Sequence, residues 1–140
     1  MEKKKVLFIC THNSARSQMA EAFLNALSSD RYEAYSGGTT PTQINPYAIK
    51  VMKEVGIDIT GHRSKSVKEF LGQNFDYVVT VCDNAKEACP FFPGGANYIH
   101  KNFQDPSSCQ GSEEEMLDCF RRIRDEIKDW LNQDFIRIRF

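Results

Sequence analysis

The chain has 140 residues, of which 41% are hydrophobic and 26% charged, with a formal net charge of -1. This length fits one domain over residues 1–140, and the near-neutral charge gives no support to a nucleic-acid or anionic-membrane partner. The apolar run Val6–Cys10 is too short for a secretory segment, and no stretch approaches membrane-spanning length. We therefore expect a cytoplasmic protein, with a monomer as the working assumption.

Hydrophobic periodicity and turn residues predict strands alternating with helices. In chain order we expect a strand at Lys4–Ile9, a helix at Ser17–Leu27, a strand at Tyr32–Ser36, a helix from Asn45-Pro46 to Gly56, a short helix at Ser66–Leu71, strands at Tyr77–Val81 and Asn97–His100, and a last helix capped by Ser112 and Glu115 that carries apolar residues from Met116 to Leu131.

This alternation is typical of an α/β fold with a mostly parallel sheet. In such sheets ligands bind outside the carboxyl ends of the strands. Cys10 follows the first predicted strand and Cys82 follows the third. Both thiols are therefore expected at the functional edge.

The loop after the first strand has the spacing Cys10-x5-Arg16, followed by Ser17. A loop that joins a buried strand to a helix N-terminus turns backbone N–H groups toward one point, and Arg16 adds a planar guanidinium, so an oxyanion can bind there. The same field favours a thiolate at Cys10, and Ser17 can donate a hydrogen bond to it. The alternative is a buried cysteine followed by ordinary helix-start residues. The predicted oxyanion-binding residues are Thr11, His12, Asn13, Ser14, Ala15, Arg16 and Ser17.

The segment CTHNSARSQMAEAF resembles the phosphate loop of the low-molecular-weight tyrosine phosphatase superfamily, and it is more similar to the thioredoxin-coupled arsenate reductases of that superfamily. The segments YSGGTTPTQINPYAI, MKEVGIDITGHRSKSV and DYVVTVCDNAKEACP also have counterparts there. The resemblance implies a three-layer αβα fold whose central four-stranded parallel sheet has the order 2-1-3-4. It also implies a soluble enzyme that converts arsenate to arsenite.

Cys82 and Cys89 are the second and third thiols of interest. Their spacing is unusual for a zinc site, and spacing alone leaves a core-filling role open. The resemblance implies a relay in which Cys10 attacks arsenate, Cys82 then forms a Cys10–Cys82 disulfide, and Cys89 forms the final Cys82–Cys89 disulfide. Thioredoxin is the expected reductant, with a glutaredoxin system as the open alternative.

A helix over Asp83–Ala88 would separate Cys82 and Cys89 by about 10 Å along its axis. A disulfide needs Cα atoms within roughly 4.4–6.8 Å of each other. We therefore expect this segment to unwind when the Cys82–Cys89 disulfide forms.

Asp105 precedes Pro106 in a predicted loop. By itself Asp-Pro is a common turn signal. The resemblance implies that Asp105 is the general acid, which protonates the oxygen leaving arsenic.

No resident metal or cofactor is expected. Some related reductases bind potassium through residues that match Asn13, Glu21 and Ser36, together with an acidic or amide side chain at the position of Lys65. Because Lys65 carries its own ammonium group, we expect no potassium requirement.

The other candidate residues have simpler interpretations. Cys119 lies at helical spacing from Met116 and is expected in the core, whereas Cys109 is expected to be a surface thiol, with an off-pathway disulfide to an active-site cysteine as the alternative. The tail Phe135–Phe140 alternates apolar and basic residues and is expected to pair at a sheet edge or to dock on the surface. Polar structural roles are expected for the three histidines, His12, His62 and His100.

Two other functions stay open. A tyrosine or small-phosphomonoester phosphatase would need only Cys10, Arg16 and Asp105, although Ser107-Ser108 replaces the tyrosines usual after the Asp-Pro of phosphatases. Weak phosphatase activity could accompany the reductase activity. A non-catalytic oxyanion sensor would have no use for Cys82 and Cys89.

Overall fold

A computed structural model describes residues 2–83 and 91–136. The strands are parallel and form one sheet in the order β2-β1-β3-β4. This confirms the predicted sheet and its order. The elements are β1 (Lys4–Cys10), α1 (Arg16–Leu27), β2 (Tyr32–Gly38), α2 (Pro46–Glu54), the 3-10 helix η1 (Val67–Phe70), β3 (Phe75–Thr80), β4 (Gly95–His100), the 3-10 helix η2 (Pro106–Ser108), α3 (Glu113–Trp130) and the π-helical turn η3 (Leu131–Ile136).

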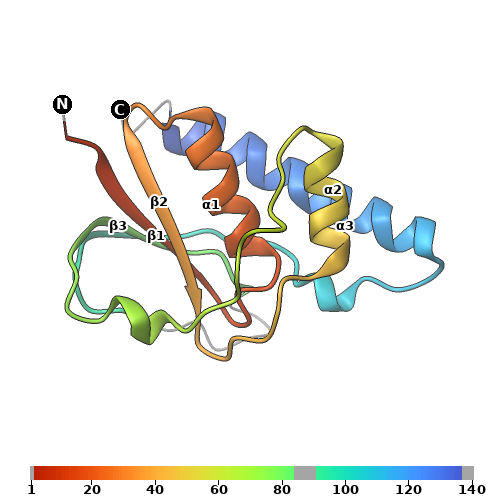
Figure 1. Ribbon diagram of the computed structural model, residues 1–140, viewed down its shortest axis with the longest axis horizontal. Coiled ribbons are helices and arrows are strands. Elements are labelled where there is room, and N and C mark those ends of the chain that lie inside the picture. Colours follow the sequence, from red (N-terminus) through yellow and green to blue (C-terminus); the bar gives the residue numbers. More distant parts are fainter. Residues whose placement is uncertain (1, 84–90, 137–140) are drawn as a thin grey trace.

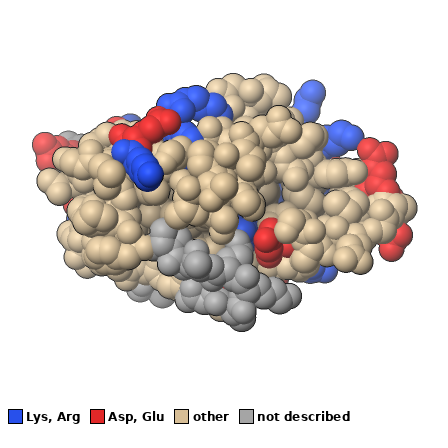
Figure 2. All heavy atoms as spheres, turned by 90° about the horizontal axis from the view of Figure 1, so that it is seen from below, with Lys and Arg blue, Asp and Glu red and all other residues tan. Residues whose placement is uncertain are grey.

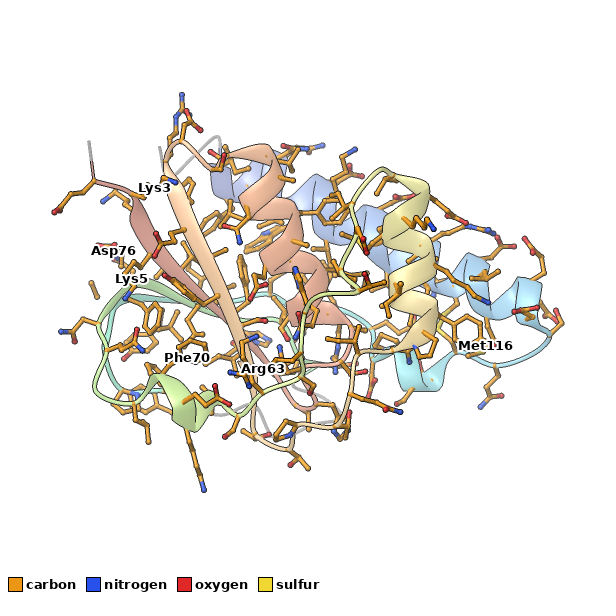
Figure 3. All side chains as sticks on the ribbon, in the orientation of Figure 1. Lys3, Lys5, Arg63, Phe70, Asp76 and Met116 are labelled. Atoms are coloured by element: carbon orange, nitrogen blue, oxygen red, sulfur yellow. A yellow bond between two sulfur atoms is a disulfide. The ribbon has the colours of Figure 1, made fainter. Side chains whose placement is uncertain are left out.

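Alternate residues of β1 contribute to two cores, one on each face of the sheet. Val6 and Phe8 pack against apolar residues of α1, α2 and α3, which lie together on one face (Figure 1). Leu7 and Ile9 pack on the other face against a smaller cluster that includes Phe70 of η1, labelled in Figure 3. Both faces of the sheet are thus covered, so a ligand can reach the sheet only at the ends of its strands.

The helix starts follow the capping signals in the sequence. Asn45 caps α2 by accepting a hydrogen bond from the backbone N–H of Tyr47 at 2.8 Å. Ser112 and Glu115 form the predicted capping box of α3. These caps satisfy backbone N–H groups that a helix otherwise leaves unpaired at its start.

The segment after α3 differs from the prediction of an edge strand or surface tail. Leu131–Ile136 continues as a π-helical turn, and Phe135 is fully buried. Its ring lies 5.4 Å from the rings of both Tyr32 and Tyr77. Phe135 therefore belongs to the core between the sheet and the helices, and only residues 137–140 of the tail lie outside the described residues.

Cys109 differs from its prediction as a surface thiol, and its bond to Cys119 was not predicted. The two cysteines form a disulfide with a Cα–Cα distance of 6.0 Å, and Cys109 is buried rather than exposed. Cys119 is half-buried at the edge of the main core, as its helical spacing predicts. The sequence pattern did not predict this bond because it joins a loop to a helix face, a tertiary contact without a local signal.

Charged side chains of both signs are spread around the face drawn in Figure 2 and form no single basic patch there. This mixed distribution on that face agrees with the near-zero net charge of the chain. Among the described residues, no helix combines the length and the apolar character needed to cross a bilayer.

Candidate active site

Cys10 is the last residue of β1, and α1 begins at Arg16, so the loop Thr11–Ala15 turns the chain from strand to helix. Asn13 has a left-handed φ of 49°, as such a tight turn requires. Gly38 lies against this loop, and a Cβ atom there would come within 2.7 Å of the Thr11 carbonyl oxygen. The absence of a side chain at Gly38 thus allows β2 to support the loop directly.

A chain of hydrogen bonds leads from the backbone N–H of Lys65 to the sulfur of Cys10. The backbone N–H of Lys65 donates to Asn13 Oδ1 at 3.0 Å, so Asn13 Nδ2 faces the other way and donates to Ser17 Oγ at 2.7 Å. Ser17 Oγ lies 2.9 Å from Cys10 Sγ, and its hydroxyl can donate to the sulfur when Cys10 is a thiolate. A donor at this position stabilises the thiolate, which is the nucleophilic form of cysteine. Cys10 is buried and has a free thiol.

Arg16 and Asp105 meet beside this sulfur. Arg16 Nη2 lies 3.7 Å from Asp105 Oδ1, and Arg16 Nη1 donates to the Phe103 carbonyl at 3.3 Å. The Arg16 side chain is 3% exposed, whereas that of Asp105 is 22% exposed. They line a cavity of about 70 Å³ together with Cys10, His12, Ser14, Ala15, Asn45, Pro106 and Ser107.

Cys82 follows the end of β3, near the edge of the sheet at which β1 ends with Cys10. The β1–β3 register pairs Ile9 with Thr80, and the backbone N–H of Val81 donates to the Ile9 carbonyl at 2.9 Å. Cys82 is therefore one residue beyond the level of Cys10 on the neighbouring strand. Neighbouring strands lie about 4.8 Å apart, so this register brings the backbone at Cys82 close to Cys10 at the same edge of the sheet.

Cys82 is oxidised in this structure, because its sulfur is part of a disulfide bond. Cys89 belongs to the segment 84–90, which lies outside the described residues. The predicted Cys82–Cys89 pairing and most of the predicted helix over Asp83–Ala88 therefore stay predictions.

Gln18 is a functional candidate that the sequence analysis did not single out. Its side chain is fully buried, and its Nε2 donates to Asn13 Oδ1 at 2.8 Å and to the Arg63 carbonyl at 2.9 Å. Its Oε1 then faces His62 Nδ1 at 3.1 Å, so that nitrogen of His62 donates. Gln18 fixes the orientation of Asn13 and, through it, of Ser17. The only sequence signal was its position directly after the Arg-Ser pair, where the related phosphatases usually have proline.

Asn45 is a second residue of this kind. It was predicted only as a helix cap, but it also lines the cavity. Its backbone N–H donates to the Ser14 carbonyl at 3.0 Å, which joins the start of α2 to the loop Thr11–Ala15.

Lys65 lies among oxygen atoms behind the loop. Its Nζ is 3.8 Å from Glu21 Oε1 and 3.5 Å from Ser36 Oγ, and it donates to the Arg63 carbonyl at 3.4 Å. Burial lowers the pKa of Lys65 from its ordinary value, and the Glu21 carboxylate opposes this shift. A cation is thus built into the chain at this position.

The histidines have the polar structural roles expected of them. His62 Nδ1 lies 3.3 Å from Glu21 Oε2, and His100 Nδ1 lies 2.6 Å from Thr80 Oγ1. His12 Nδ1 donates to the Thr40 carbonyl at 3.1 Å, and its ring lines the cavity. Within residues 2–83 and 91–136, no cluster of three or more His, Cys, Asp or Glu side chains could hold a metal ion.

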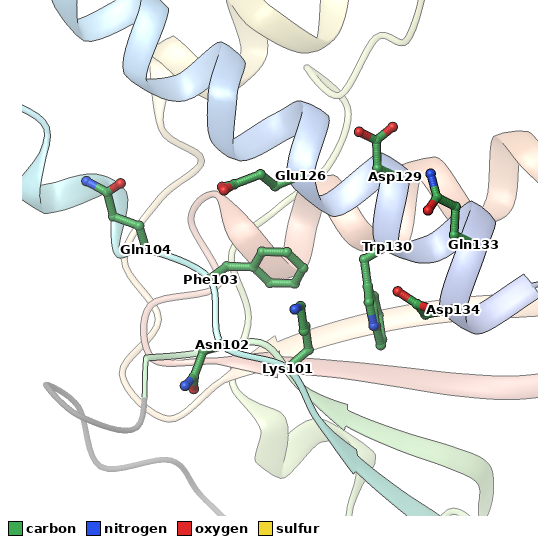
Figure 4. Close-up of a pocket in the computed structure, with 9 residues that line it drawn as sticks. All are labelled: Lys101, Asn102, Phe103, Gln104, Glu126, Asp129, Trp130, Gln133 and Asp134. Atoms are coloured by element: carbon green, nitrogen blue, oxygen red, sulfur yellow. The ribbon is translucent and has the colours of Figure 1, made fainter.

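A larger cavity of about 340 Å³ lies between Lys101–Gln104 and the end of α3 (Figure 4). Among the described residues, its lining includes Glu126, Asp129 and Asp134 but no cysteine and no arginine. Without a nucleophile or an anion-binding guanidinium, this cavity does not compete with the Cys10 loop as a reaction site.

The chain as a whole is similar to known proteins. The profile of the family described as low molecular weight phosphotyrosine protein phosphatase matches residues 5–138. The chain belongs to this family. The arsenate reductase of Bacillus subtilis is 43% identical over 133 residues, which cover 95% of this chain and 96% of that protein.

Solved structures place the chain near the reductases within this phosphatase family. A structure described as an arsenate reductase in the phosphate binding state superposes with a TM-score of 0.81 at 30% identity, covering 96% of this chain and 98% of that one. A thioredoxin-dependent arsenate reductase of Corynebacterium glutamicum superposes with a TM-score of 0.66 at 26% identity, covering 93% of this chain and 61% of that one.

Proposed function

We propose that this protein is a thioredoxin-coupled arsenate reductase that works by a three-cysteine relay. The observation that carries the proposal is the position of Cys82, disulfide-bonded and one residue beyond the level of the free thiol of Cys10 on the adjacent strand. A phosphatase needs the first thiol only. A second thiol at the same edge of the sheet can supply the electrons for a reduction.

In the first step the Cys10 thiolate attacks arsenate held by the loop and Arg16, forming a sulfur–arsenic bond. The departing oxygen takes a proton from Asp105 and leaves as water. Asp105 suits this role because it lies beside Arg16 at the cavity wall and is partly exposed to solvent.

In the second step the Cys82 thiolate attacks the sulfur of Cys10. The sulfur–arsenic bond breaks and both of its electrons stay on arsenic, so arsenite leaves and a Cys10–Cys82 disulfide remains. Cys89 then attacks Cys82, which frees Cys10 and gives the Cys82–Cys89 disulfide. The dithiol of thioredoxin returns two electrons to that bond and closes the cycle.

Arsenate is favoured over phosphotyrosine by the size and lining of the cavity. A volume of about 70 Å³ is small for an aromatic phosphate ester, whereas drug-sized ligands occupy roughly 300–1,000 Å³. Ser107 lines the cavity at a place where an aromatic ring would be needed to stack on a tyrosine substrate. Slow hydrolysis of small phosphomonoesters is still expected, because the loop binds phosphate and arsenate by the same contacts.

We also propose that the reaction does not require potassium. Lys65 Nζ lies beside Glu21 and Ser36, two of the residues that would ligate the ion, and its ammonium group supplies the positive charge. These residues therefore do not fit a second cation.

The test is a coupled assay with arsenate, thioredoxin, thioredoxin reductase and NADPH. Wild-type protein should oxidise NADPH in proportion to arsenate, and neither Cys82→Ser nor Cys89→Ser should sustain turnover. Sustained turnover by Cys82→Ser would remove the relay from the mechanism.

A further inference from the structure

The Cys109–Cys119 disulfide has no place in the relay, yet it is attached to the active site. Cys109 directly follows η2, and Cys119 lies in α3. The same loop carries Asp105, Pro106 and Ser107, which line the cavity beside Cys10. The bond therefore joins one wall of the active-site cavity to α3.

Few other bonds hold this loop to α3. Gln104 accepts a hydrogen bond from Arg122 of α3. Its Nε2 donates to Ser108 Oγ at 2.9 Å, a bond within the loop itself. Most remaining hydrogen bonds stay within the loop, such as those of Ser107 N and Ser108 Oγ to Asp105. Hydrogen bonds between exposed side chains contribute little to stability. Phe103 at the start of the segment packs its ring 6.1 Å from that of Trp130 in α3, and the disulfide is the one covalent link of the loop to this helix.

The surroundings of Cys119 suit reversible thiol chemistry. Arg122 Nη2 lies 3.7 Å from Cys119 Sγ, and Gln104 Nε2 lies 3.8 Å from it. A guanidinium at this distance stabilises a thiolate, which is the leaving group when the disulfide is reduced and the attacking group when it forms again. Cys109 is only 7% exposed, which limits the access of protein reductants to this bond.

We propose that Cys109 and Cys119 form a redox modification site separate from the relay, and that its oxidation holds the Asp105 wall of the cavity in its working position. A peroxide converts the Cys119 thiolate to a sulfenic acid and releases hydroxide. The Cys109 thiol then displaces water from that sulfenic acid, so two thiols and one peroxide give the disulfide and two waters. A dithiol returns the two electrons and frees the loop. The effect on turnover rests on the proposed function, whereas the effect on the loop does not.

The loop is tested in a full-length variant with Cys10, Cys82 and Cys89 replaced by Ser, which leaves Cys109 and Cys119 as its only cysteines. Hydrogen peroxide oxidises the pair, dithiothreitol reduces it, and maleimide labelling with mass spectrometry reports its state. Hydrogen exchange over residues 103–109 should be about tenfold faster in the reduced form, because the loop then opens more often. Exchange over Tyr32–Gly38 is the internal control and should not change.

Equal exchange over 103–109 in the two forms would overturn the proposal. So would a disulfide that dithiothreitol fails to open while the protein stays folded. Because the oxidised and reduced forms have one sequence, the comparison does not depend on whether a further substitution folds.

Turnover is tested with the relay intact by comparing wild type with Cys109→Ser/Cys119→Ser, under conditions in which labelling shows the wild-type bond to persist. The kcat of the double variant should fall about threefold to tenfold, because loss of the disulfide removes part of the rate contribution of a positioned general acid. Asp105→Asn should lower kcat less in the double variant than in wild type. Equal losses would overturn the coupling. If Asp105→Asn has no effect in either background, the acid role proposed above fails, and the exchange experiment still decides the claim about the loop.

Discussion

The reactivity of Cys10 depends on a few side chains with fixed hydrogen-bond directions. A backbone N–H can only donate a hydrogen bond, and a backbone carbonyl can only accept one. The bond from the Lys65 N–H therefore fixes the orientation of the Asn13 side-chain amide, and the bond to the Arg63 carbonyl fixes that of the Gln18 amide. The Ser17 hydroxyl is then left to donate to the sulfur. The sequence identified Cys10, Arg16 and Ser17 by their spacing. It could not identify Gln18, because a buried glutamine and an exposed one look alike in a helix start.

Gln18→Leu keeps the approximate size of the side chain and removes its hydrogen bonds. We expect the rate of Cys10 alkylation by iodoacetamide at neutral pH to fall about tenfold, and stability to fall by about 2 kcal/mol, because buried polar partners lose their bonds. The measurement is the alkylation rate followed by mass spectrometry.

Asn25→Leu is the matched control for Gln18→Leu. Asn25 lies on the same helix and makes two hydrogen bonds to the backbone of Ala34, far along the chain from the loop. It should lose stability without losing alkylation rate. An equal loss of rate in both variants would show that Gln18 acts only through stability.

Lys65→Gln tests the substitution of an ammonium group for a potassium ion. With the charge removed, Glu21 and Ser36 keep their oxygens and gain room for a cation. Turnover of the variant should rise with potassium, by about threefold or more, whereas that of wild type should not respond. A wild-type enzyme stimulated by potassium would contradict the role assigned to Lys65.

At the scale of elements, α2 and α3 are joined by a charged cluster. Glu54 at the end of α2 accepts hydrogen bonds from Arg121 at 2.7 Å and from Arg124 at 2.9 Å. The bond from Arg121 is the main cause that lowers the pKa of Glu54 below its ordinary 4.5, with burial acting in the opposite direction. Because α2 also carries Asn45 to the cavity, this cluster supports the site from a distance.

Glu54→Gln should lower the free energy of unfolding by about 1 kcal/mol at pH 7, a value kept small because the carboxylate is partly exposed. The folded-state pKa is lowered, so the contribution is fully present above pH 4.5 and is lost as pH falls through the folded-state value. Urea titrations of both proteins should therefore give curves of stability against pH that converge below pH 4.5.

Glu113→Gln is the control for this cluster. Glu113 also joins α3 to α2, through Lys50 at 3.0 Å, but both side chains are more than half exposed. The free energy of unfolding of Glu113→Gln should differ little from that of wild type at any pH. A gap between wild type and Glu54→Gln that persists unchanged at low pH would contradict the ionic origin of the effect.

Local signals account for most of the elements. The apolar run before Cys10, the Asn45-Pro46 cap and the Ser112 capping box each specify a boundary through bonds between near neighbours, and the structure agrees with them. Two features depended instead on distant parts of the chain. The burial of Phe135 needs rings from Tyr32 and Tyr77, and the Cys109–Cys119 bond needs α3 to pass beside the loop.

At the scale of the whole molecule, the parallel sheet brings the site together. Its order places β1 between β2 and β3, so the loop after β1 is supported by Gly38 on one side and faces Cys82 on the other. Asp105 then arrives from the segment after β4. The sheet thus brings Cys10, Cys82 and Asp105, which lie far apart in the chain, toward one edge. The ends of the predicted strands indicated this edge for Cys10 and Cys82, whereas Asp105 was expected there from the family resemblance.

A single turnover of arsenate without any external reductant tests the relay most directly. Fully reduced protein should yield one arsenite per chain and a mass lower by two hydrogens, with peptide mapping locating the new disulfide between Cys82 and Cys89. Cys82→Ser should release no arsenite while it keeps a reactive Cys10. Arsenite release by Cys82→Ser at the wild-type rate, or brisk phosphatase activity by a wild-type protein that yields no arsenite, would contradict the account.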